Sequence, residues 1–129
     1  MTASLPALIV DDSPAARALA RAALEGAAEA LGLALDVEEA GSGMEALRAL
    51  TAATQAVVIL DLHMPDMTGL EVLSFWRQRG GGARAIIVST EVSPRDREKA
   101  HELGAHALLE KPVTVEALTE VLRGLAVPG

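Results

Sequence analysis

The sequence predicts an α/β fold in which five parallel strands form one sheet and five helices cover its two faces, in a single domain. Short apolar runs alternate with longer segments of helical character along the whole chain. Strands that alternate with helices pair in parallel through right-handed crossovers, and this connection places helices on both faces of the sheet. The length of 129 residues is close to the commonest size of one domain.

Composition fits a globular protein and excludes several functional classes. Half of the residues are hydrophobic, 2% are aromatic, and the formal net charge is -7. A nucleic-acid surface needs clustered Lys and Arg, so we expect no nucleic-acid partner. The absence of Cys excludes disulfides and thiol catalysis. No apolar run approaches the ~20 residues of a membrane-spanning helix, and residues 1–6 lack the basic region of a signal peptide. We therefore expect a cytoplasmic protein without membrane insertion.

The N-terminal third predicts two strands around one helix. Residues 7–10 are apolar and read as a buried strand. Ser13 followed by Pro14 indicates a helix start, with an N-cap hydroxyl and a proline in the first turn. The Ala-rich helix should end near Leu31, where Gly32 can adopt the left-handed closing conformation. Residues 33–38 alternate apolar and polar side chains, a pattern typical of a half-exposed strand at a sheet edge.

The middle of the chain predicts the central strand. Residues 42–45 (SGME) match a capping box, in which the Ser hydroxyl and the Glu carboxylate each accept from a backbone N–H of the other residue. Residues 56–60 form the most apolar run and end at Asp61, so we expect a strand buried on both faces. A loop over residues 63–69 should lead to a helix from about residue 70 to 79. Phe75 and its neighbour Trp76 cannot both face the core, and the pattern does not decide between them.

The C-terminal part predicts two more strand–helix units. Residues 85–88 read as a strand, followed by a helix that Ser93 and Pro94 open. Residues 107–109 read as a short fifth strand that runs through Glu110 into Lys111 and Pro112. Thr114 can cap the last helix, with Val113 packing on Leu118 as a hydrophobic staple. The apolar stripe of that helix comprises Leu118, Val121, Leu122 and Leu125. We expect one domain over residues 1–129, with its core at about 6–125 and a short tail at 127–129.

Polar side chains follow four of the expected strands. In open parallel sheets ligands bind beyond the carboxyl ends of the strands. These ends carry Asp11 and Asp12, Asp61, Ser89 and Thr90, and Lys111. Three carboxylates brought together repel one another, and one ammonium leaves about two negative charges for a divalent cation to offset. Oxygen ligands favour hard ions, and Mg²⁺ typically combines one or two carboxylates with water and phosphate oxygens. The site therefore predicts phosphate chemistry with Mg²⁺.

These residues resemble the receiver domain of bacterial response regulators over essentially the whole chain. The resemblance is carried by the acidic pair Asp11–Asp12, the run DLHMPDMTG at residues 61–69, the hydroxyl of Ser89, and Lys111 followed by a proline. Each motif is weak alone, but the four in order at matching strand ends are highly specific. The resemblance implies a stand-alone, chemotaxis-receiver-like domain with a flavodoxin-like doubly wound sheet of strand order 2-1-3-4-5.

The resemblance also implies a role for each site residue. Asp61 would be the phosphoacceptor, and its carboxylate would attack phosphorus in line to give an acyl phosphate. Asp12, Asp61 and the backbone carbonyl of His63 would ligate Mg²⁺, while Asp11 would act largely through water. Lys111 would pair with a phosphoryl oxygen. Mg²⁺ would offset charge on the equatorial oxygens.

The same resemblance implies a switch. A cis bond before Pro112 would aim the preceding lysine, and Ser89 would hydrogen-bond a phosphoryl oxygen. Ser89 and Thr90 would then move the start of the fourth helix and reshape the face of helix four, strand five and helix five. Alignment on Val88 makes Ser89 the switch residue and leaves Thr90 unusual. Many family members carry an aromatic residue where this chain has Leu108, so the output here depends on backbone shifts or on Thr90.

The sequence does not assign a role to two side chains near the acids. His63 lies two residues after Asp61, and Glu91 two residues after Ser89. The imidazole and the carboxylate lie where they could flank the phosphoryl group and tune its hydrolysis. The resemblance itself uses only the backbone carbonyl of His63.

Partners and alternatives follow from this interpretation. We expect a sensor histidine kinase or phosphotransfer protein as donor, a downstream protein target, and a monomer or weak homodimer. Because no effector domain follows residue 129, output should come from protein binding or phosphate relay. One alternative is a haloacid-dehalogenase-like Mg²⁺ phosphatase, but such enzymes need an Asp where His63 stands. A second alternative is an unphosphorylated receiver-like scaffold, and the presence of Leu108 in place of an aromatic residue keeps this alternative open. The hypothesis of a flavin-binding site has less support, because no Ser/Thr/Gly-rich phosphate loop follows the first strand.

Overall fold

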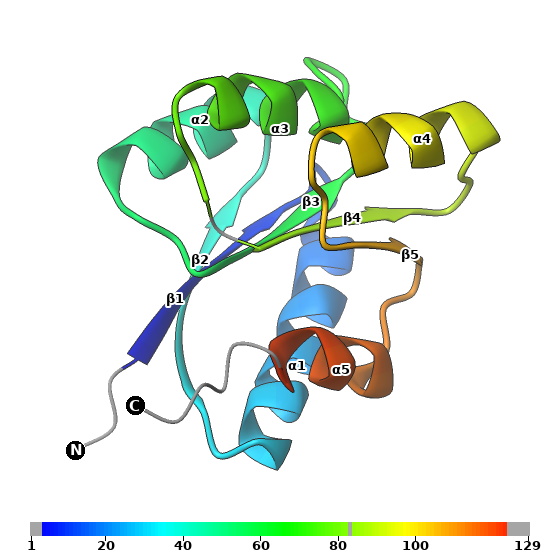
Figure 1. The fold of residues 1–129 in the computed structure, drawn as a ribbon. Helices are drawn as coiled ribbons and strands as arrows, with labels where there is room; N and C mark the ends of the chain where they lie inside the picture. The colour runs from blue at the N-terminus through cyan, green and yellow to red at the C-terminus, as the bar shows by residue number, and fades with distance from the viewer. Residues whose placement is uncertain (1–3, 83, 124–129) are drawn as a thin grey trace.

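The computed structural model describes residues 4–82 and 84–123, and within them five strands alternate with five helices (Figure 1). The strands are Ser4–Val10 (β1), Ala34–Ala40 (β2), Val57–Asp61 (β3), Arg84–Ser89 (β4) and Ala107–Glu110 (β5). The helices are Pro14–Ala30 (α1), Gly43–Ala52 (α2), Gly69–Gln78 (α3), Pro94–Glu102 (α4) and Val115–Arg123 (α5). The predicted alternation is confirmed.

The strands form one parallel sheet in the order β2-β1-β3-β4-β5. This is the doubly wound order that the resemblance implies. β2 lies at one edge, as its alternating pattern predicts, with Asp36 and Glu38 exposed. β3 lies at the centre, and all five of its residues are buried. Since β1 and β3 are neighbours, the acidic residues at their carboxyl ends meet at the same edge of the sheet.

Helices cover both faces of the sheet, and side chains of each strand alternate between them. α2, α3 and α4 lie on one face and α1 and α5 on the other (Figure 1). Along β1, Leu8 and Val10 belong to the core under α2 and α3, whereas Ala7 and Ile9 pack with α1 and α5. β3 and β4 alternate in the same way. Both cores consist mainly of aliphatic side chains, as the low aromatic content requires.

Most helix starts follow the predicted caps. The hydroxyls of Ser13, Ser93 and Thr114 accept from backbone N–H groups in the first turns of α1, α4 and α5. Gly32, just after α1, has φ 68°, the left-handed conformation that favours glycine. The Lys111–Pro112 peptide bond is cis, as the resemblance implies.

Only one of the two hydrogen bonds of the predicted capping box at Ser42 and Glu45 is present. Ser42 does accept from the N–H of Glu45, but the Glu45 carboxylate accepts from the N–H of Gly41 instead of from Ser42. Ser42 is fully extended at φ -157° and ψ 166°, and the glutamate reaches the amide one residue earlier. Reciprocal pairs occur instead at the starts of α3, between Thr68 and Glu71, and of α4, between Ser93 and Asp96.

The structure shows which of the two adjacent aromatic residues faces the core, and it does not describe the last residues of the predicted C-terminal helix and tail. Trp76 is 7% exposed and belongs to the core, whereas Phe75 is 42% exposed. Leu125, the last residue of the predicted α5 stripe, and the expected tail at 127–129 lie outside the described residues. Leu118, Val121 and Leu122 are buried as predicted. Among residues 4–82 and 84–123, no helix has both the length and the apolar character required to cross a bilayer.

Candidate functional site

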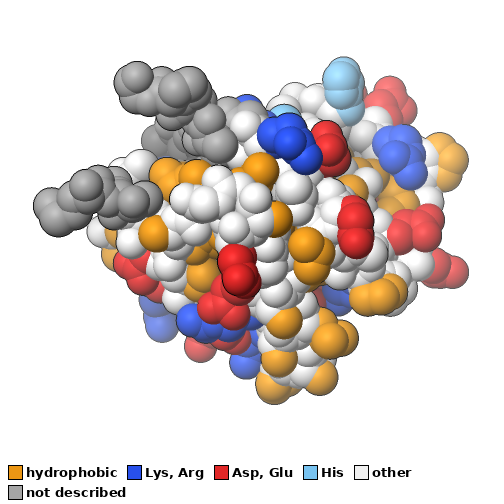
Figure 2. Space-filling model, turned by 90° about the horizontal axis from the view of Figure 1, so that it is seen from below, with side chains coloured by type: hydrophobic (Ala, Val, Ile, Leu, Met, Phe, Trp, Pro, Cys, Tyr) orange, Lys and Arg blue, Asp and Glu red, His pale blue; other side chains and the backbone are white. Residues whose placement is uncertain are grey.

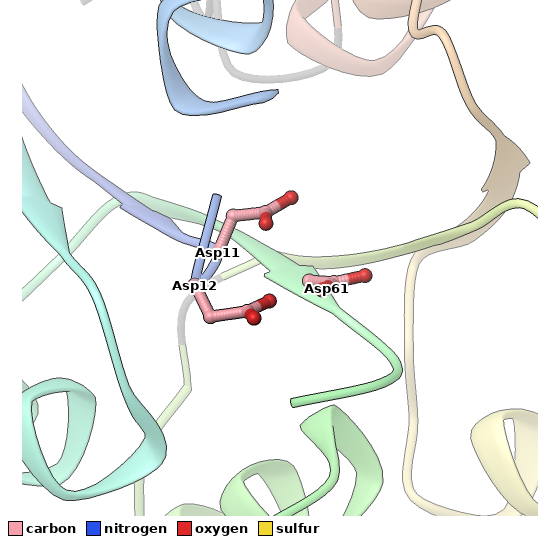
Figure 3. A group of neighbouring side chains, drawn as sticks. All are labelled: Asp11, Asp12 and Asp61. Carbon is pink, nitrogen blue, oxygen red and sulfur yellow. The ribbon is translucent and has the colours of Figure 1, made fainter. Parts of the chain in front are cut away.

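Three carboxylates meet beyond the ends of β1 and β3. Asp11 and Asp12 follow β1, Asp61 ends β3, and one oxygen from each lies within 4.8 Å of the others. Figure 3 shows the three side chains extending toward the same side, past the strand ends. Asp11 and Asp61 are each 4% exposed, while Asp12 is exposed. The sequence prediction that these acids cluster is confirmed.

Lys111 faces two of these acids. Its Nζ lies 2.7 Å from Asp11 Oδ2 and 3.1 Å from Asp61 Oδ1. The alternation of side chains along strands gives the reason. Ile9, Ile59 and Leu109 all pack toward α1 and α5, so the residues two positions later are directed to that same side. Those residues are Asp11, Asp61 and Lys111.

The electrostatics of the site follow from burial and from these ion pairs. Burial raises the pKa of the Asp61 carboxyl and the charge of Asp11 adds to the rise, against the lowering effect of hydrogen bonds from Lys111 and from the backbone of His63. Burial lowers the pKa of the Lys111 ammonium, but its hydrogen bonds to Asp11 and Asp61 outweigh burial and raise the pKa above its ordinary value. The ammonium therefore stays charged while two carboxylates share it.

The donor set fits a hard divalent cation. Three carboxylates and one ammonium leave about two negative charges, matching one divalent ion. The oxygens belong to carboxylates and are close enough to share one ion, and Mg²⁺ selects oxygen ligands. Because Lys111 engages Asp11 and Asp61, the exposed Asp12 carboxylate is the acid most accessible to an ion and its water shell.

Backbone contacts fix Asp11 in place. Its Oδ1 accepts from the N–H of Ser13 at 2.9 Å, and its backbone carbonyl accepts from Arg17 Nη1 at 2.7 Å. Arg17 Nε also donates to Glu39 of β2, which in turn accepts from Arg21. Sequence reasoning did not identify Arg17, because neither its spacing from Asp11 nor its distance in sequence from Glu39 forms a local motif.

Ser89 is fully buried at the end of β4. Its hydroxyl donates to the backbone carbonyl of Glu91 and accepts from the N–H of the same residue at 3.2 Å. The hydroxyl thus closes the β4–α4 loop on itself in this structure. Thr90 is exposed and, with Asp11 and Lys111, lines a hollow beside the acids. The two hydroxyls therefore have different surroundings. His63 and Glu91 are both exposed, and their side-chain roles stay predictions.

The β3–α3 loop is tied to α2 by a residue that the sequence did not single out. Asp66 Oδ1 accepts from the N–H of Gly43 and Oδ2 from the N–H of Met44, each at 3.0 Å. These hydrogen bonds lower the pKa of the Asp66 carboxyl. Met67 packs so closely on Gly43 that a Cβ there would lie 2.0 Å from Met67 Cγ. No local pattern links residues 23 positions apart, so only the fold reveals this contact.

An apolar hollow adjoins the acids on the side of α1. It has a volume of about 260 Å³, and its lining includes Ala16, Leu19 and Ala20 of α1 with Pro112 and Val113 after β5. Leu19 is 62% exposed. The face formed by α1 and α5, seen in Figure 2, mixes acidic, basic and hydrophobic side chains. The hollow therefore offers apolar contact next to the charged site.

Comparisons with known proteins agree with the fold and the site. The family model of the response regulator receiver domain matches residues 7–123. Transcriptional regulatory protein TrcR of Mycobacterium tuberculosis is 34% identical over 120 residues, 92% of this chain and 44% of the relative. Sensory/regulatory protein RpfC of Xanthomonas campestris pv. campestris is 33% identical over 128 residues, 96% of this chain and 17% of the relative. The chain thus spans less than half the length of these two curated relatives.

A solved structure extends the likeness to the whole fold. The chemotaxis protein CheY4 of Vibrio cholerae superposes with a TM-score of 0.81 at 31% identity, covering 95% of this chain and 98% of that chain. The sheet order, the acidic pocket at the ends of β1 and β3, and the family match over nearly all of the described residues agree with one another. This chain belongs to the response regulator receiver domains of two-component systems.

Proposed function

We propose that Asp61 accepts a phosphoryl group, with Mg²⁺ held by Asp12, Asp61 and the backbone carbonyl of His63, and with Asp11 acting largely through water. Phosphorylation on an aspartate with Mg²⁺ is a general property of receiver domains. The observation that carries the proposal for this chain is the convergence of three carboxylates with the Lys111 ammonium at one strand edge.

The proposed reaction is an in-line displacement. A carboxylate oxygen of Asp61 forms a bond to phosphorus while the bond from phosphorus to the donor's leaving group breaks, and the product is an acyl phosphate. Bound Mg²⁺ would supply offsetting charge for the phosphoryl oxygens. Lys111, now 3.1 Å from Asp61 Oδ1, would transfer its hydrogen bond to a phosphoryl oxygen. Asp11 would keep the ammonium in place through its 2.7 Å contact.

The proposed output begins at Ser89. Its hydroxyl now bonds the Glu91 backbone, and a phosphoryl oxygen offers a competing charged acceptor. Exchange of partners would release the loop that leads into α4 and alter the face of α4, β5 and α5. Leu108 packs under the α2–α3–α4 layer and is too small for an aromatic rotamer switch. The output would then depend on backbone movement of the loop or on a route through Thr90.

We propose a protein phosphodonor, either a sensor histidine kinase or a phosphotransfer protein. The apolar hollow beside Asp11 and Lys111 supports a macromolecular donor, because a small phosphodonor would need no apolar contact. A related sequence occurs in the sensor histidine kinase RcsC of Salmonella typhi. Such exchange would take place in the cytoplasm. The protein would act as a monomer or weak homodimer on a downstream protein target.

The other two interpretations have less support. A haloacid-dehalogenase-like phosphatase needs a second aspartate two residues after its nucleophile, and His63 occupies that position with its side chain exposed. An unphosphorylated scaffold would not need the buried acids, whose repulsion costs stability unless the lysine and a cation offset it.

Labelling tests the proposal directly. Incubation with acetyl phosphate and Mg²⁺ should add one phosphoryl group to the wild type, measured by intact-protein mass spectrometry. Asp61→Asn should remain unlabelled, and Asp66→Asn, which retains Asp61, should still be labelled at saturating Mg²⁺. Equal labelling of wild type and Asp61→Asn would remove Asp61 from its role. Steady release of phosphate from simple phosphate esters would favour the phosphatase.

A further inference from the structure

The β3–α3 loop, residues 62–68, is anchored differently at its ends and at its middle. At its start, the N–H of Leu62 donates to the Val88 carbonyl at 2.8 Å. At its end, the N–H of Gly69 donates back to the Leu62 carbonyl at 2.9 Å. Between these two bonds, the backbone of His63 also hydrogen-bonds the Asp61 carboxylate, but none of these contacts holds the middle of the loop around the exposed Pro65 and Asp66.

The middle of the loop is held by side chains that reach α2. Both oxygens of Asp66 accept from the first backbone amides of that helix, at Gly43 and Met44. We call this pair of hydrogen bonds the Asp66 latch. A carboxylate at a helix N-terminus is favoured by the unpaired N–H groups and by the helix dipole. Met67 packs on Gly43 beside the latch, so polar and apolar contacts fix the same short segment.

We propose that Asp66 is a positioning residue for the divalent-cation site: by fixing the β3–α3 loop on α2, it orients the backbone that carries the His63 carbonyl. This inference rests on the proposed function, since His63 is a ligand only in that scheme. Loss of groups that orient metal ligands typically weakens metal binding about 10- to 100-fold. Asp66 lies outside the acidic cluster itself, so its effect would be transmitted through the loop.

The same helix end supplies a matched control. The Glu45 carboxylate accepts from the N–H of Gly41, two residues before α2 begins, and it holds no part of the loop. Asp66→Ala and Glu45→Ala therefore each remove a carboxylate that binds backbone amides near the start of the same helix. Both should lower the Tm measured by thermal unfolding, whereas only Asp66→Ala releases the loop.

The decisive measurement is the affinity of the unphosphorylated protein for Mg²⁺, by isothermal titration or by NMR shifts of backbone amides. We expect Asp66→Ala to bind Mg²⁺ about tenfold more weakly than wild type, and Glu45→Ala to stay within about twofold. Amide hydrogen exchange over residues 62–68 should speed up only in Asp66→Ala. If Asp66→Ala does not fold, Asp66→Asn decides, because its amide oxygen keeps one of the two hydrogen bonds and should give an intermediate affinity.

Labelling with acetyl phosphate separates positioning from general damage. The labelling rate of Asp66→Ala should fall at limiting Mg²⁺ and return to near the wild-type rate at saturating Mg²⁺. Equal Mg²⁺ affinities for Asp66→Ala, Glu45→Ala and wild type would overturn the inference while leaving the proposed function intact. If the wild type itself neither binds Mg²⁺ nor becomes labelled, the proposed function fails and the inference fails with it.

Discussion

Substitution of Gly69 by alanine should damage the site without touching any charged group. Gly69 is buried at the start of α3, directly against the backbone of Asp61, the proposed phosphoacceptor. A Cβ added there would lie 2.4 Å from the Asp61 carbonyl oxygen and 3.1 Å from its carbonyl carbon. Real Cβ atoms essentially never approach below 3.0 Å, so the two segments must separate by roughly 0.6 Å.

The size of the effect follows from what must move. The obstructing atoms belong to the backbone of β3, the fully buried central strand, and cannot rotate away as a side chain could. Overpacking of a well-packed interior costs about 1–3 kcal/mol, and a backbone obstacle places Gly69→Ala near the upper end. For a domain of this size about 3 kcal/mol corresponds to a fall in Tm of roughly 10 °C.

A matched glycine isolates the steric effect. A Cβ at Gly82 meets nothing within 4 Å, and its φ lies outside the left-handed range. Gly82→Ala should therefore be neutral or stabilise the protein by up to about 1 kcal/mol. Thermal unfolding by circular dichroism gives the Tm values, and the initial rate of acetyl phosphate labelling reports on Asp61. The reasoning is refuted if Gly69→Ala and Gly82→Ala show the same Tm and the same labelling rate.

Three further predictions concern other contacts. Arg77→Met should lower the free energy of unfolding by about 3 kcal/mol, because the Arg77 guanidinium donates to the backbone carbonyls of Gly81, Leu103 and Gly104. Arg79→Met loses a cation–π contact with Phe75 and should lower it less. Denaturant unfolding measures both variants. Hydrogen bonds from Arg21 lower the pKa of Glu39, with Arg17 adding to the effect, so the stability that Glu39 contributes is complete above the ordinary pKa near 4.5 and disappears as pH falls through the lower folded-state pKa. The Tm difference between wild type and Glu39→Gln should accordingly shrink below pH 4.5, and a constant difference would contradict the assignment. Ser89→Ala should still be labelled at Asp61 but show smaller phosphorylation-induced NMR shifts in α4, whereas Thr90→Ala should retain them; the opposite result would move the switch to Thr90.

The parts of the site that the sequence predicted are those that strand alternation determines. Asp11, Asp61 and Lys111 each follow an apolar strand, and parallel pairing brings such ends together whatever the details of the loops. The strand order itself came from the resemblance and not from the pattern, because periodicity does not say which strands are neighbours. The N-caps at Ser13 and Ser93 were predictable because a cap and its partner lie within one turn.

The parts that the sequence did not predict depend on contacts between residues far apart in the chain, or on local alternatives that the sequence pattern does not distinguish. Asp66 reaches an amide 23 positions away, and Arg77 reaches carbonyls after the next strand and helix. The Glu45 carboxylate had two amides within reach, and only the backbone conformation of Ser42 decides between them. Trp76 is buried and its neighbour exposed because of the orientation of α3 on the sheet, which its own sequence does not specify.

The strand order has a mechanical consequence for Asp61. β1 runs on into a helix beneath the sheet and β3 into a helix above it, so the two central strands lead to opposite layers. A group added at their common edge lies next to Asp11, whose carbonyl is held by Arg17 of the lower layer, and at the root of the loop that Asp66 fixes to the upper layer. A covalent change at Asp61 would therefore lie close to contacts with the helix layers on both faces of the sheet.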